Sequence, residues 1–481
     1  MALTQKAERA ALNKLIDYLD ENPEEHIPQI MELIDKLVPA SVFPAQRTAI
    51  SSAIRDRSNW YELIMRIFHL NPSMRSRLLK TLIVDANLLA WPVQQKSRER
   101  EQCNIPWAIL LDPTSACNLH CTGCWAAEYG HALNLSYNDI CSIIDQGREL
   151  GTHIYIYTGG EPMVRKRDLI RICEKYPDCA FLCFTNATLI DEEFCEDMIR
   201  VANFIPAISA EGTEATTDAR RGKGTYAKIM RAMELLRGHG LPFGISACWT
   251  SANADAIASE RYFDWMIDQG ALFCWFFHYM PVGKGSPAEL MPTVEQRERM
   301  YRFVREMRSV KPLFTLDFQN DGEYVGGCIA GGRRYLHINA AGDVEPCVFI
   351  HYANANIHDV SLLEALKSSL FMKYYEGQPF NQNHLRPCPM LENPERLGQM
   401  VQESGAHGTD LVEPESPAEL RAKTEQRAAE WKPVAERLWG DESNEMFAKR
   451  HDPYQGMDDI EREKFQRLGR DVEAERAATF S

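Results

Sequence analysis

The chain has no apolar run of about eighteen residues, the length that a membrane-spanning helix needs. Its first thirty residues mix Lys, Glu and Asp with Leu and Ile, so they also lack the apolar segment of a secretory signal. Basic residues are outnumbered by acidic ones, 53 to 68, whereas a general nucleic-acid binder needs clustered Lys and Arg. We therefore expect a cytoplasmic protein that does not bind nucleic acid.

Cysteine is absent from both ends of the chain. All fourteen cysteines lie between Cys103 and Cys388, in a sequence of 481 residues. In a large chain without an export signal, cysteines more often ligate metals or form buried thiols than form disulfides. The chemistry of the thiols is therefore expected in the central segment, with appendages on either side.

The segment before the first cysteine has a helical pattern. Residues 8–94 carry apolar side chains at a spacing close to 3.6 residues, interrupted at Pro23, Pro39, Pro44 and Pro72. Residues 1–102 are therefore predicted to form an N-terminal helical domain of about four or five helices.

From residue 106, short apolar runs alternate with helical stretches, a pattern typical of βα repeats and a parallel sheet. Strands are predicted at residues 107–112, 153–157, 180–185, 204–209, 243–249 and 272–279. Helices are predicted at about residues 137–150, 166–176, 191–201, 225–238, 258–269 and 293–308. The fold class is therefore α/β, with a partial (β/α)6 barrel over residues 103–310 and its chemistry at the carboxyl ends of the strands.

Two further regions follow the predicted barrel. Residues 311–400 contain a probable hairpin, with strands at residues 335–338 and 344–349 and a turn at residues 339–343. Residues 401–481 are rich in charge and carry no strand signal, so a tail of exposed helices with a disordered end is expected there.

Cys117, Cys121 and Cys124 lie on one short loop directly after the first predicted strand. Three thiolates on one loop can hold three irons of a cubane cluster and leave the fourth iron with an open coordination position. The alternatives are a zinc knuckle or three buried thiols, but structural zinc normally needs four ligands.

The spacing of these three cysteines resembles that of the radical S-adenosylmethionine (SAM) superfamily, and the resemblance covers residues 106–310. It implies a partial (β/α)6 barrel and a 4Fe-4S cluster whose open iron binds SAM. It also implies reductive cleavage of SAM to a 5'-deoxyadenosyl radical, with an electron donor such as flavodoxin or ferredoxin. The family usually has an aromatic residue before the third cysteine, whereas this chain has Gly123 there.

The resemblance also implies SAM contacts at the ends of later strands. The tripeptide at residues 159–161 is similar to the GGE motif that receives the SAM ammonium, and residues 209–226 are similar to a pattern that contacts its ribose or carboxylate. The candidate SAM-binding residues are Gly159, Gly160, Glu161, Ser209, Arg221 and Asn253. A plain turn, a polar strand end and a solvated loop are the alternatives at these positions.

A second set of cysteines, Cys328, Cys347 and Cys388, lies in and after the predicted hairpin. The pair Cys328 and Cys347 resembles the start of a SPASM domain, which binds auxiliary iron-sulfur clusters. Only Cys388 follows this pair, so the single-cluster version, called twitch, is the closer match. The resemblance implies an auxiliary 4Fe-4S cluster whose fourth iron carries water, substrate or an earlier cysteine such as Cys274. Three unrelated thiols are the alternative.

Together these features predict a SAM-cleaving oxidoreductase or transferase that abstracts a hydrogen atom from its substrate, in the modification of a peptide or protein. A small metabolite or a lipid is the alternative substrate. The lipid is suggested by the amphipathic stretch 74–91, which can lie on a membrane surface or pack on the barrel. A non-enzymatic iron-sulfur sensor or scaffold is the alternative of another class. The sequence identifies neither a catalytic residue nor the bond formed.

Overall fold

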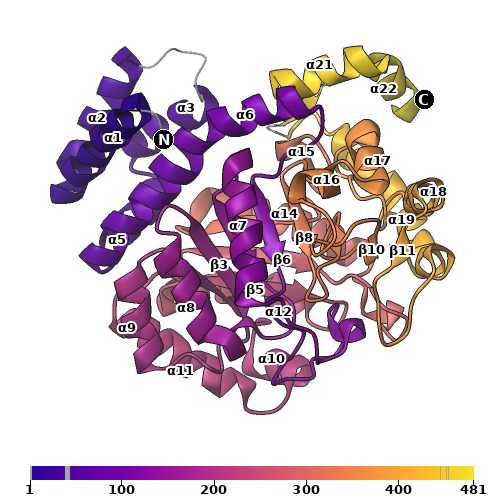
Figure 1. The fold of residues 1–481 in the computed structure, drawn as a ribbon, viewed down its shortest axis with the longest axis horizontal. Coiled ribbons are helices and arrows are strands. Elements are labelled where there is room, and N and C mark those ends of the chain that lie inside the picture. Colours follow the sequence, from indigo (N-terminus) through magenta and orange to yellow (C-terminus); the bar gives the residue numbers. More distant parts are fainter. Residues whose placement is uncertain (1–2, 38–43, 445, 451, 453, 481) are drawn as a thin grey trace.

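The computed structural model describes residues 3–480 except 38–43, 445, 451 and 453. A central sheet carries helices on its outer face, the N-terminal helices lie along one side of it, and the C-terminal helices pack on the other (Figure 1). No helix in the described part of the chain combines the length and the apolar character that crossing a membrane requires.

The N-terminal region is helical, as predicted. Its elements are α1 (Leu3–Glu21), α2 (Pro23–Leu37), α3 (Pro44–Asp56), α4 (Asn59–Phe68), α5 (Pro72–Leu79), the π-helix η1 (Lys80–Leu89) and α6 (Ala90–Glu101). Arg66 on α4 donates hydrogen bonds to the carbonyl oxygens of Ile267, Ala271 and Pro312, which ties these helices to the barrel.

The predicted amphipathic stretch lies in α5 and η1. Met74 and Leu78 belong to the main core, and Leu82 packs against it, so this part of the stretch packs on the barrel. Ile83 and Leu88 are 42% and 37% exposed, and the lipid alternative stays a prediction.

The central sheet has nine strands in the order β7-β6-β5-β4-β3-β2-β1-β8-β9. They are β1 (Ala108–Leu111), β2 (Ile154–Tyr157), β3 (Ala180–Thr185), β4 (Phe204–Ser209), β5 (Gly244–Trp249), β6 (Phe273–His278), β7 (Phe314–Asp317), β8 (Tyr335–Ile338) and β9 (Val344–Glu345). All pairs are parallel except β8 with β9. The six predicted barrel strands are confirmed, and so is the hairpin, but its second strand ends at Glu345 and not at residue 349. No pairing between β7 and β9 closes the sheet within the described residues.

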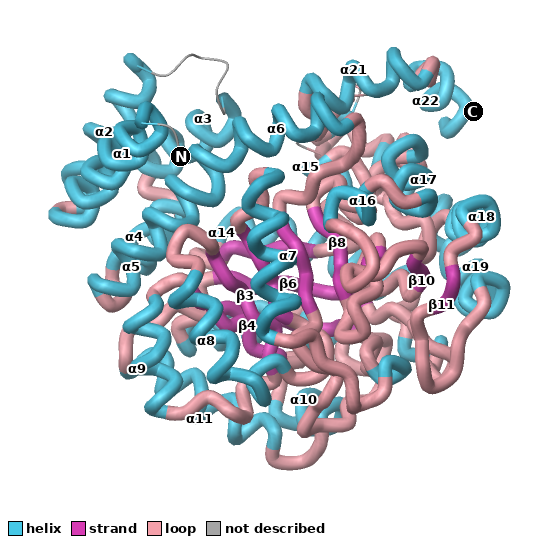
Figure 2. The backbone as a smooth tube through the Cα atoms, in the orientation of Figure 1, coloured by secondary structure: helices cyan, strands magenta, loops and turns pink. Residues whose placement is uncertain are grey.

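Helices connect the parallel strands and lie outside the sheet (Figure 2). They are α7 (Tyr137–Leu150), α8 (Lys166–Lys175), α9 (Glu192–Val201), α10 (Glu214–Arg221), α11 (Thr225–Gly238), α12 (Ala254–Ile257), α13 (Glu260–Gln269) and α14 (Val294–Val310), with 3-10 turns η2 (Ala127–Tyr129), η3 (Pro162–Arg165) and η4 (Ala288–Leu290). Polar caps fix several starts: Ser136 and Asp139 form a capping box at α7, and Asp191 caps α9.

The chain after β7 is mostly helical. It forms α15 (Gly322–Val325), α16 (Leu362–Leu366), α17 (Ser369–Gly377), α18 (Pro394–Ser404), α19 (Pro417–Trp439), α20 (Phe447–Arg450), α21 (Asp459–Leu468) and α22 (Val472–Phe480), with a two-stranded sheet of β10 (Tyr352–Ala353) and β11 (His407–Gly408). The tail is helical as predicted, but it is not simply exposed. Trp431 on α19 is 1% exposed, and its indole N–H donates to the carbonyl oxygen of Leu385 at 2.8 Å.

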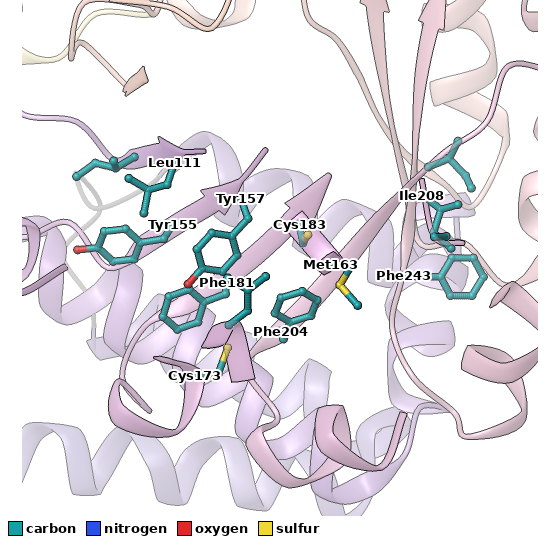
Figure 3. Close-up of a cluster of buried hydrophobic side chains, with 14 of the residues drawn as sticks. Leu111, Tyr155, Tyr157, Met163, Cys173, Phe181, Cys183, Phe204, Ile208 and Phe243 are labelled. Atoms are coloured by element: carbon teal, nitrogen blue, oxygen red, sulfur yellow. The ribbon is translucent and has the colours of Figure 1, made fainter. Parts of the chain in front are cut away.

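The main core lies between the sheet and its outer helices (Figure 3). Tyr157 and Phe181 stack with their ring centroids 5.7 Å apart, and the thiols of Cys173 and Cys183 are buried beside them. Burial raises the pKa of both thiols well above its ordinary value, so they stay protonated. They behave as small apolar side chains, as the sequence predicts for cysteines outside the two sets.

Asn203 fastens one βα connection in this core. It is fully buried just before β4, and its Nδ2 donates to the carbonyl oxygens of Cys173, Tyr176 and Cys179 at 3.2, 3.0 and 3.0 Å. These carbonyls belong to the segment that leads from α8 into β3.

We predict that Asn203→Ala lowers the free energy of unfolding by about 1 to 3 kcal/mol, because buried carbonyl oxygens lose their donor. Urea unfolding followed by circular dichroism measures the change. Asn134→Ala, at an exposed asparagine, is the matched control. Equal stability of the two variants would show that the amide bonds contribute nothing.

Candidate functional site

A cavity of about 210 Å³ opens at the carboxyl ends of the strands, and we call it the rim cavity. The strand ends converge there because parallel strands all end at the same edge of the sheet. Most of the residues predicted from the sequence line it: Cys117, Cys121, Cys124, Gly159, Gly160, Glu161, Ser209 and Arg221. Asn253 is the one predicted SAM-binding residue that does not line the rim cavity.

The three thiols of the rim cavity lie on the loop between β1 and η2. The backbone N–H of Thr122 donates to the carbonyl oxygen of Arg220 at 2.9 Å, which anchors the loop to the end of α10. Arg221 Nη1 donates to the sulfur of Cys121 at 3.9 Å. Burial raises the pKa of the Cys117 thiol to about 11, and the other two thiols push it in the same direction.

The kind of group that this loop fits follows from its geometry. Within the described residues, no three His, Cys, Asp or Glu side chains converge on a point where a single metal ion would sit. A cubane cluster spreads its thiolate ligands around several irons, and three thiols on one loop that line the same cavity are a donor set that suits it. Thiolate binding to iron would release the protons that burial retains.

The GGE segment packs directly on the start of the cysteine loop. The N–H groups of Gly160 and Glu161 donate to the carbonyl oxygens of Thr114 and Ala116 at 3.0 and 2.8 Å. A Cβ atom on Gly160 would lie 2.2 Å from the carbonyl oxygen of Ala116. Glycine is therefore required where the two backbones meet.

Glu161 is buried against the rim cavity and is 2% exposed. Its Oε1 accepts hydrogen bonds from Met163 N at 2.9 Å and Thr185 Oγ1 at 2.7 Å, and its Oε2 accepts one from Asn186 N at 2.7 Å. Burial raises the pKa of Glu161, and these hydrogen bonds oppose the shift. A carboxylate offers about four acceptor positions, so one is left for a ligand.

Two arginines that line the cavity share one buried carboxylate. Glu211 accepts hydrogen bonds from Arg221 Nε at 2.7 Å and from Arg220 Nη1 at 3.0 Å. Burial lowers the pKa of Arg221, but Glu211 more than offsets this, and the net pKa is raised. The pair therefore carries two positive charges against one negative charge. Arg220 and Glu211 were not predicted as SAM-binding residues, although both lie within residues 209–226.

The side chain of Asn253 is occupied in the turn after β5. Its Oδ1 accepts hydrogen bonds from the backbone N–H and the hydroxyl of Thr250 at 2.6 and 3.2 Å, and its Nδ2 donates to the carbonyl oxygen of Cys248 at 3.1 Å. Its SAM contact stays a prediction. Ser209, at the end of β4, does line the cavity.

An aromatic ring lies beside Gly123 although it comes from a distant segment. A Cβ atom on Gly123 would lie 2.5 Å from Cε2 of Tyr279, which follows β6 and lines the same cavity. Gly123 has φ of +65°, a conformation that favours glycine. The small residue before the third cysteine thus makes room for the Tyr279 ring, a contact without any local sequence signal.

The second set of cysteines lines a larger cavity of about 530 Å³, which we call the rear cavity. Cys347 is hydrogen-bonded to the hydroxyl of Tyr335 at 2.7 Å, and the sulfur of Cys388 accepts from two backbone N–H groups at 3.4 Å. Burial raises the pKa of Cys328 to about 11 and that of Cys347 to about 12. Cys274 lies in the main core instead and lines neither cavity.

The rim and rear cavities adjoin. Residues that line both include Trp107, Trp275, Phe318, Arg334 and Phe349. A ligand bound against this shared wall therefore lies between the two sets of cysteines.

Comparison with known proteins gives matches to the same region. Residues 111–251 match the radical SAM superfamily. The AdoMet-dependent heme synthase of Methanosarcina barkeri is 24% identical over 285 residues, 53% of this chain and 80% of that protein. The PqqA peptide cyclase of Gluconobacter oxydans is 25% identical over 302 residues, 60% of this chain and 84% of that protein. The crystal structure of Streptococcus suis SuiB bound to the precursor peptide SuiA has a TM-score of 0.48 at 17% identity and covers 57% of this chain and 67% of its own.

We predict that Gly160→Ala lowers the stability of the protein by about 1 to 3 kcal/mol, because the added methyl group forces the GGE segment away from the cysteine loop. Urea unfolding and the iron content after anaerobic reconstitution both measure the effect, and both are expected to fall. Gly238→Ala is the control, because this helical glycine has open space around it. Wild-type stability and iron content in Gly160→Ala would refute the steric argument.

Proposed function

We propose that this radical SAM enzyme holds its 4Fe-4S cluster through Cys117, Cys121 and Cys124 and binds SAM in the rim cavity. The family implies both the cluster and SAM. The observation that carries the assignment is that the three thiols and the GGE segment line one cavity. When bound, the cluster would supply the electron that breaks a carbon-sulfur bond of SAM, and the resulting 5'-deoxyadenosyl radical would take a hydrogen atom from the substrate.

Different residues of the rim cavity suit different groups of SAM. The free acceptor position of Glu161 suits the ammonium group. The excess positive charge of Arg220 and Arg221 suits the carboxylate. Ser209 suits the ribose. Aromatic side chains on the shared wall keep water away from the radical.

The second proposal is an auxiliary 4Fe-4S cluster on Cys328, Cys347 and Cys388. This assignment is supported by the position of the three thiols, which all line the rear cavity. The side chain of Cys274 lies in the main core and does not line that cavity, which favours an open fourth iron that carries water or substrate. We further propose four regions. Residues 1–102 form a helical domain that packs on the barrel of residues 103–310, residues 311–400 bind the second cluster, and residues 401–481 pack over the region of residues 311–400.

The substrate is proposed to be a peptide or protein, which the similarity to a PqqA peptide cyclase supports. A small molecule is the second candidate, favoured by the relatives that are named heme synthases. In both cases the reacting carbon would lie on the shared wall, within reach of both sets of thiols. Flavodoxin or ferredoxin is the proposed electron donor.

We predict that Cys117→Ala, Cys121→Ala and Cys124→Ala each abolish SAM cleavage, because a cluster that loses one of three thiolates is lost or altered. Anaerobic formation of 5'-deoxyadenosine with dithionite and SAM measures this. Cys195→Ala, at a buried thiol of α9 outside both cavities, is the control and is expected to keep the activity. A fully iron-loaded wild type without 5'-deoxyadenosine would instead favour an iron-sulfur sensor or scaffold.

We predict about eight irons per chain in the reconstituted wild type and about four in the triple Cys117/Cys121/Cys124 alanine variant, from two cubanes of four irons each. Iron and sulfide analysis measures both values. The spectrum of the remaining cluster should not change when Cys274 is also replaced by alanine. A triple variant without iron would rule out the second cluster, and a spectrum altered by Cys274→Ala would rule out its open iron.

A further inference from the structure

Arg334 stands on the wall that the two cavities share. It immediately precedes β8, and its backbone is fixed on both sides. Its N–H donates to the carbonyl oxygen of Ile329 at 2.9 Å, and its carbonyl oxygen accepts from Trp107 and Ala108 at 2.8 and 2.9 Å. The sheet thus fixes the backbone of Arg334 at the shared wall, and its Nη1 donates to the carbonyl oxygen of Arg333 at 3.1 Å.

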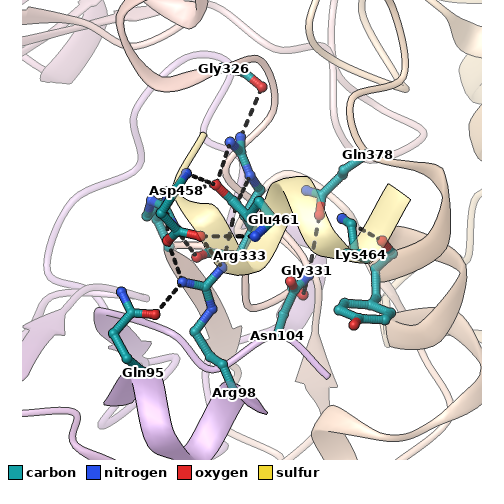
Figure 4. A network of polar contacts seen from close by, with 12 residues as sticks. Gln95, Arg98, Asn104, Gly326, Gly331, Arg333, Gln378, Asp458, Glu461 and Lys464 are labelled. Carbon is teal, nitrogen blue, oxygen red and sulfur yellow. Dashed lines mark hydrogen bonds and ion pairs between the residues drawn. The ribbon is translucent and has the colours of Figure 1, made fainter. Parts of the chain in front are cut away.

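The charges behind Arg334 do not balance. Helix α21 places Glu461 and Asp458 against a group of arginines (Figure 4). Arg333 Nε donates to Glu461 Oε1 at 2.6 Å, and Arg98 is bound to Asp458. Arg334 Nη2 shares Glu461 at 3.1 Å. Three guanidiniums therefore face two carboxylates in this network.

The neighbouring charged groups do not correct the imbalance. On helix α21, Lys464 donates to the carbonyl oxygen of Tyr375 at 2.8 Å and brings no negative charge. Asp321, the carboxylate that lines the rear cavity, is bound to Arg308 at 2.6 Å. Among the described residues that line the rear cavity, Arg334 is the one basic side chain, and it shares Glu461 with Arg333.

The titration of Arg334 agrees with this count. Burial lowers its pKa, Glu461 opposes the shift, and Arg333 and Arg98 add to it. Its positive charge is therefore less compensated than that of Arg221, whose pKa is raised. An anion from outside the chain would stabilise it.

Apart from Arg334, Gln319 and Asp321, the side chains that line the rear cavity are mostly apolar. Phe318, Phe349, Ile350 and Trp275 line it beside the three thiols. A ligand that fills this space must have an apolar body, and the cation at its wall selects a charge of opposite sign. The planar fork of a guanidinium matches a carboxylate, which it can bind with two parallel hydrogen bonds.

We propose that Arg334 binds a carboxylate of the substrate, whose apolar body lies in the rear cavity between the two sets of cysteines. This inference rests on the proposed function, because it names the substrate class of that site. A peptide can supply the carboxylate from its C-terminus or an acidic side chain, and a small molecule can supply it from an alkanoate arm. Glu461 is then the internal counter-ion that the substrate partly replaces.

The test uses the full-length, iron-loaded protein under anaerobic conditions with SAM present. The probes are 1-naphthaleneacetate and its neutral amide, and calorimetry gives both dissociation constants. The wild type should prefer the acid by about tenfold or more, the size expected for a charge-assisted hydrogen bond. Absence of a preference, or no binding of either probe, would overturn the proposal.

Variants separate recognition from a purely structural role. Arg334→Met should abolish the preference for the acid, and Arg334→Lys should keep part of it. Glu461→Gln should increase the preference, because the counter-ion is gone, and this variant decides the matter if Arg334→Met does not fold. Arg100→Met, at an exposed arginine of α6, is the control. A preference that is unchanged in Arg334→Met or lowered in Glu461→Gln would refute the proposal.

A second pair of probes identifies the source of the carboxylate. An apolar tripeptide with a free C-terminus is compared with the same peptide amidated. Preference for the free peptide assigns the carboxylate to a peptide, and preference for naphthaleneacetate alone assigns it to a small molecule. Formation of 5'-deoxyadenosine by the wild type without substrate is measured separately. Its failure would sink the proposed function, whereas loss of acid preference alone would sink only this inference.

Discussion

The site depends on the contact between two stretches of backbone, residues 114–116 after β1 and residues 160–161 after β2. The hydrogen bonds from Gly160 and Glu161 to Thr114 and Ala116 leave no space for a side chain between them. These contacts fix the start of the cysteine loop against the GGE segment. The carboxylate of Glu161 and the thiol of Cys117 face the same cavity because of this contact.

Strand β1 also positions the second set of cysteines, because its other edge pairs with β8. It pairs in parallel with β2 on one side and with β8 on the other, so Leu111 is opposite both Tyr157 and Ile338. The GGE segment follows β2, and Arg334 immediately precedes β8, with Cys328 and Cys347 on the segments around that strand. One short buried strand thus fixes the separation of the two sets of thiols, and with it the size of the space for a substrate.

The sequence predicted the strands whose signal is local. Strands β1 to β6 are mostly runs of buried apolar residues, and their boundaries agree with the structure to within about a residue. Strand β7 was missed because Phe314–Asp317 is short and carries Thr315 and Asp317, and helix α10 was missed because Glu214–Arg221 has almost no apolar residues. The hairpin was predicted, but its pairing with β1 joins segments more than two hundred residues apart, and no local pattern encodes such a partner.

In the candidate site, too, the features with a local sequence signal were predicted and those that depend on distant contacts were not. Motif spacing placed Cys117, Cys121 and Cys124 on one loop, but it could not show that Tyr279 would lie against Gly123. Buried charge is the part that sequence reveals least, because its partners are fixed only by the fold. His337 on β8 lies between Asp112 at 2.9 Å and Glu345 at 2.6 Å.

This buried triad explains how the hairpin stays attached to the end of β1. Burial lowers the pKa of His337, but the two carboxylates more than compensate and raise it to about 10. Because the folded pKa is above that of an unfolded histidine, about 6.5, the stabilisation is complete below that pH. It declines above pH 6.5 and is lost as the pH rises through about 10. At neutral pH the imidazolium still joins Asp112, after β1, to Glu345 on β9, two residues before Cys347, so this ion network fixes the hairpin that carries one thiol of the second set.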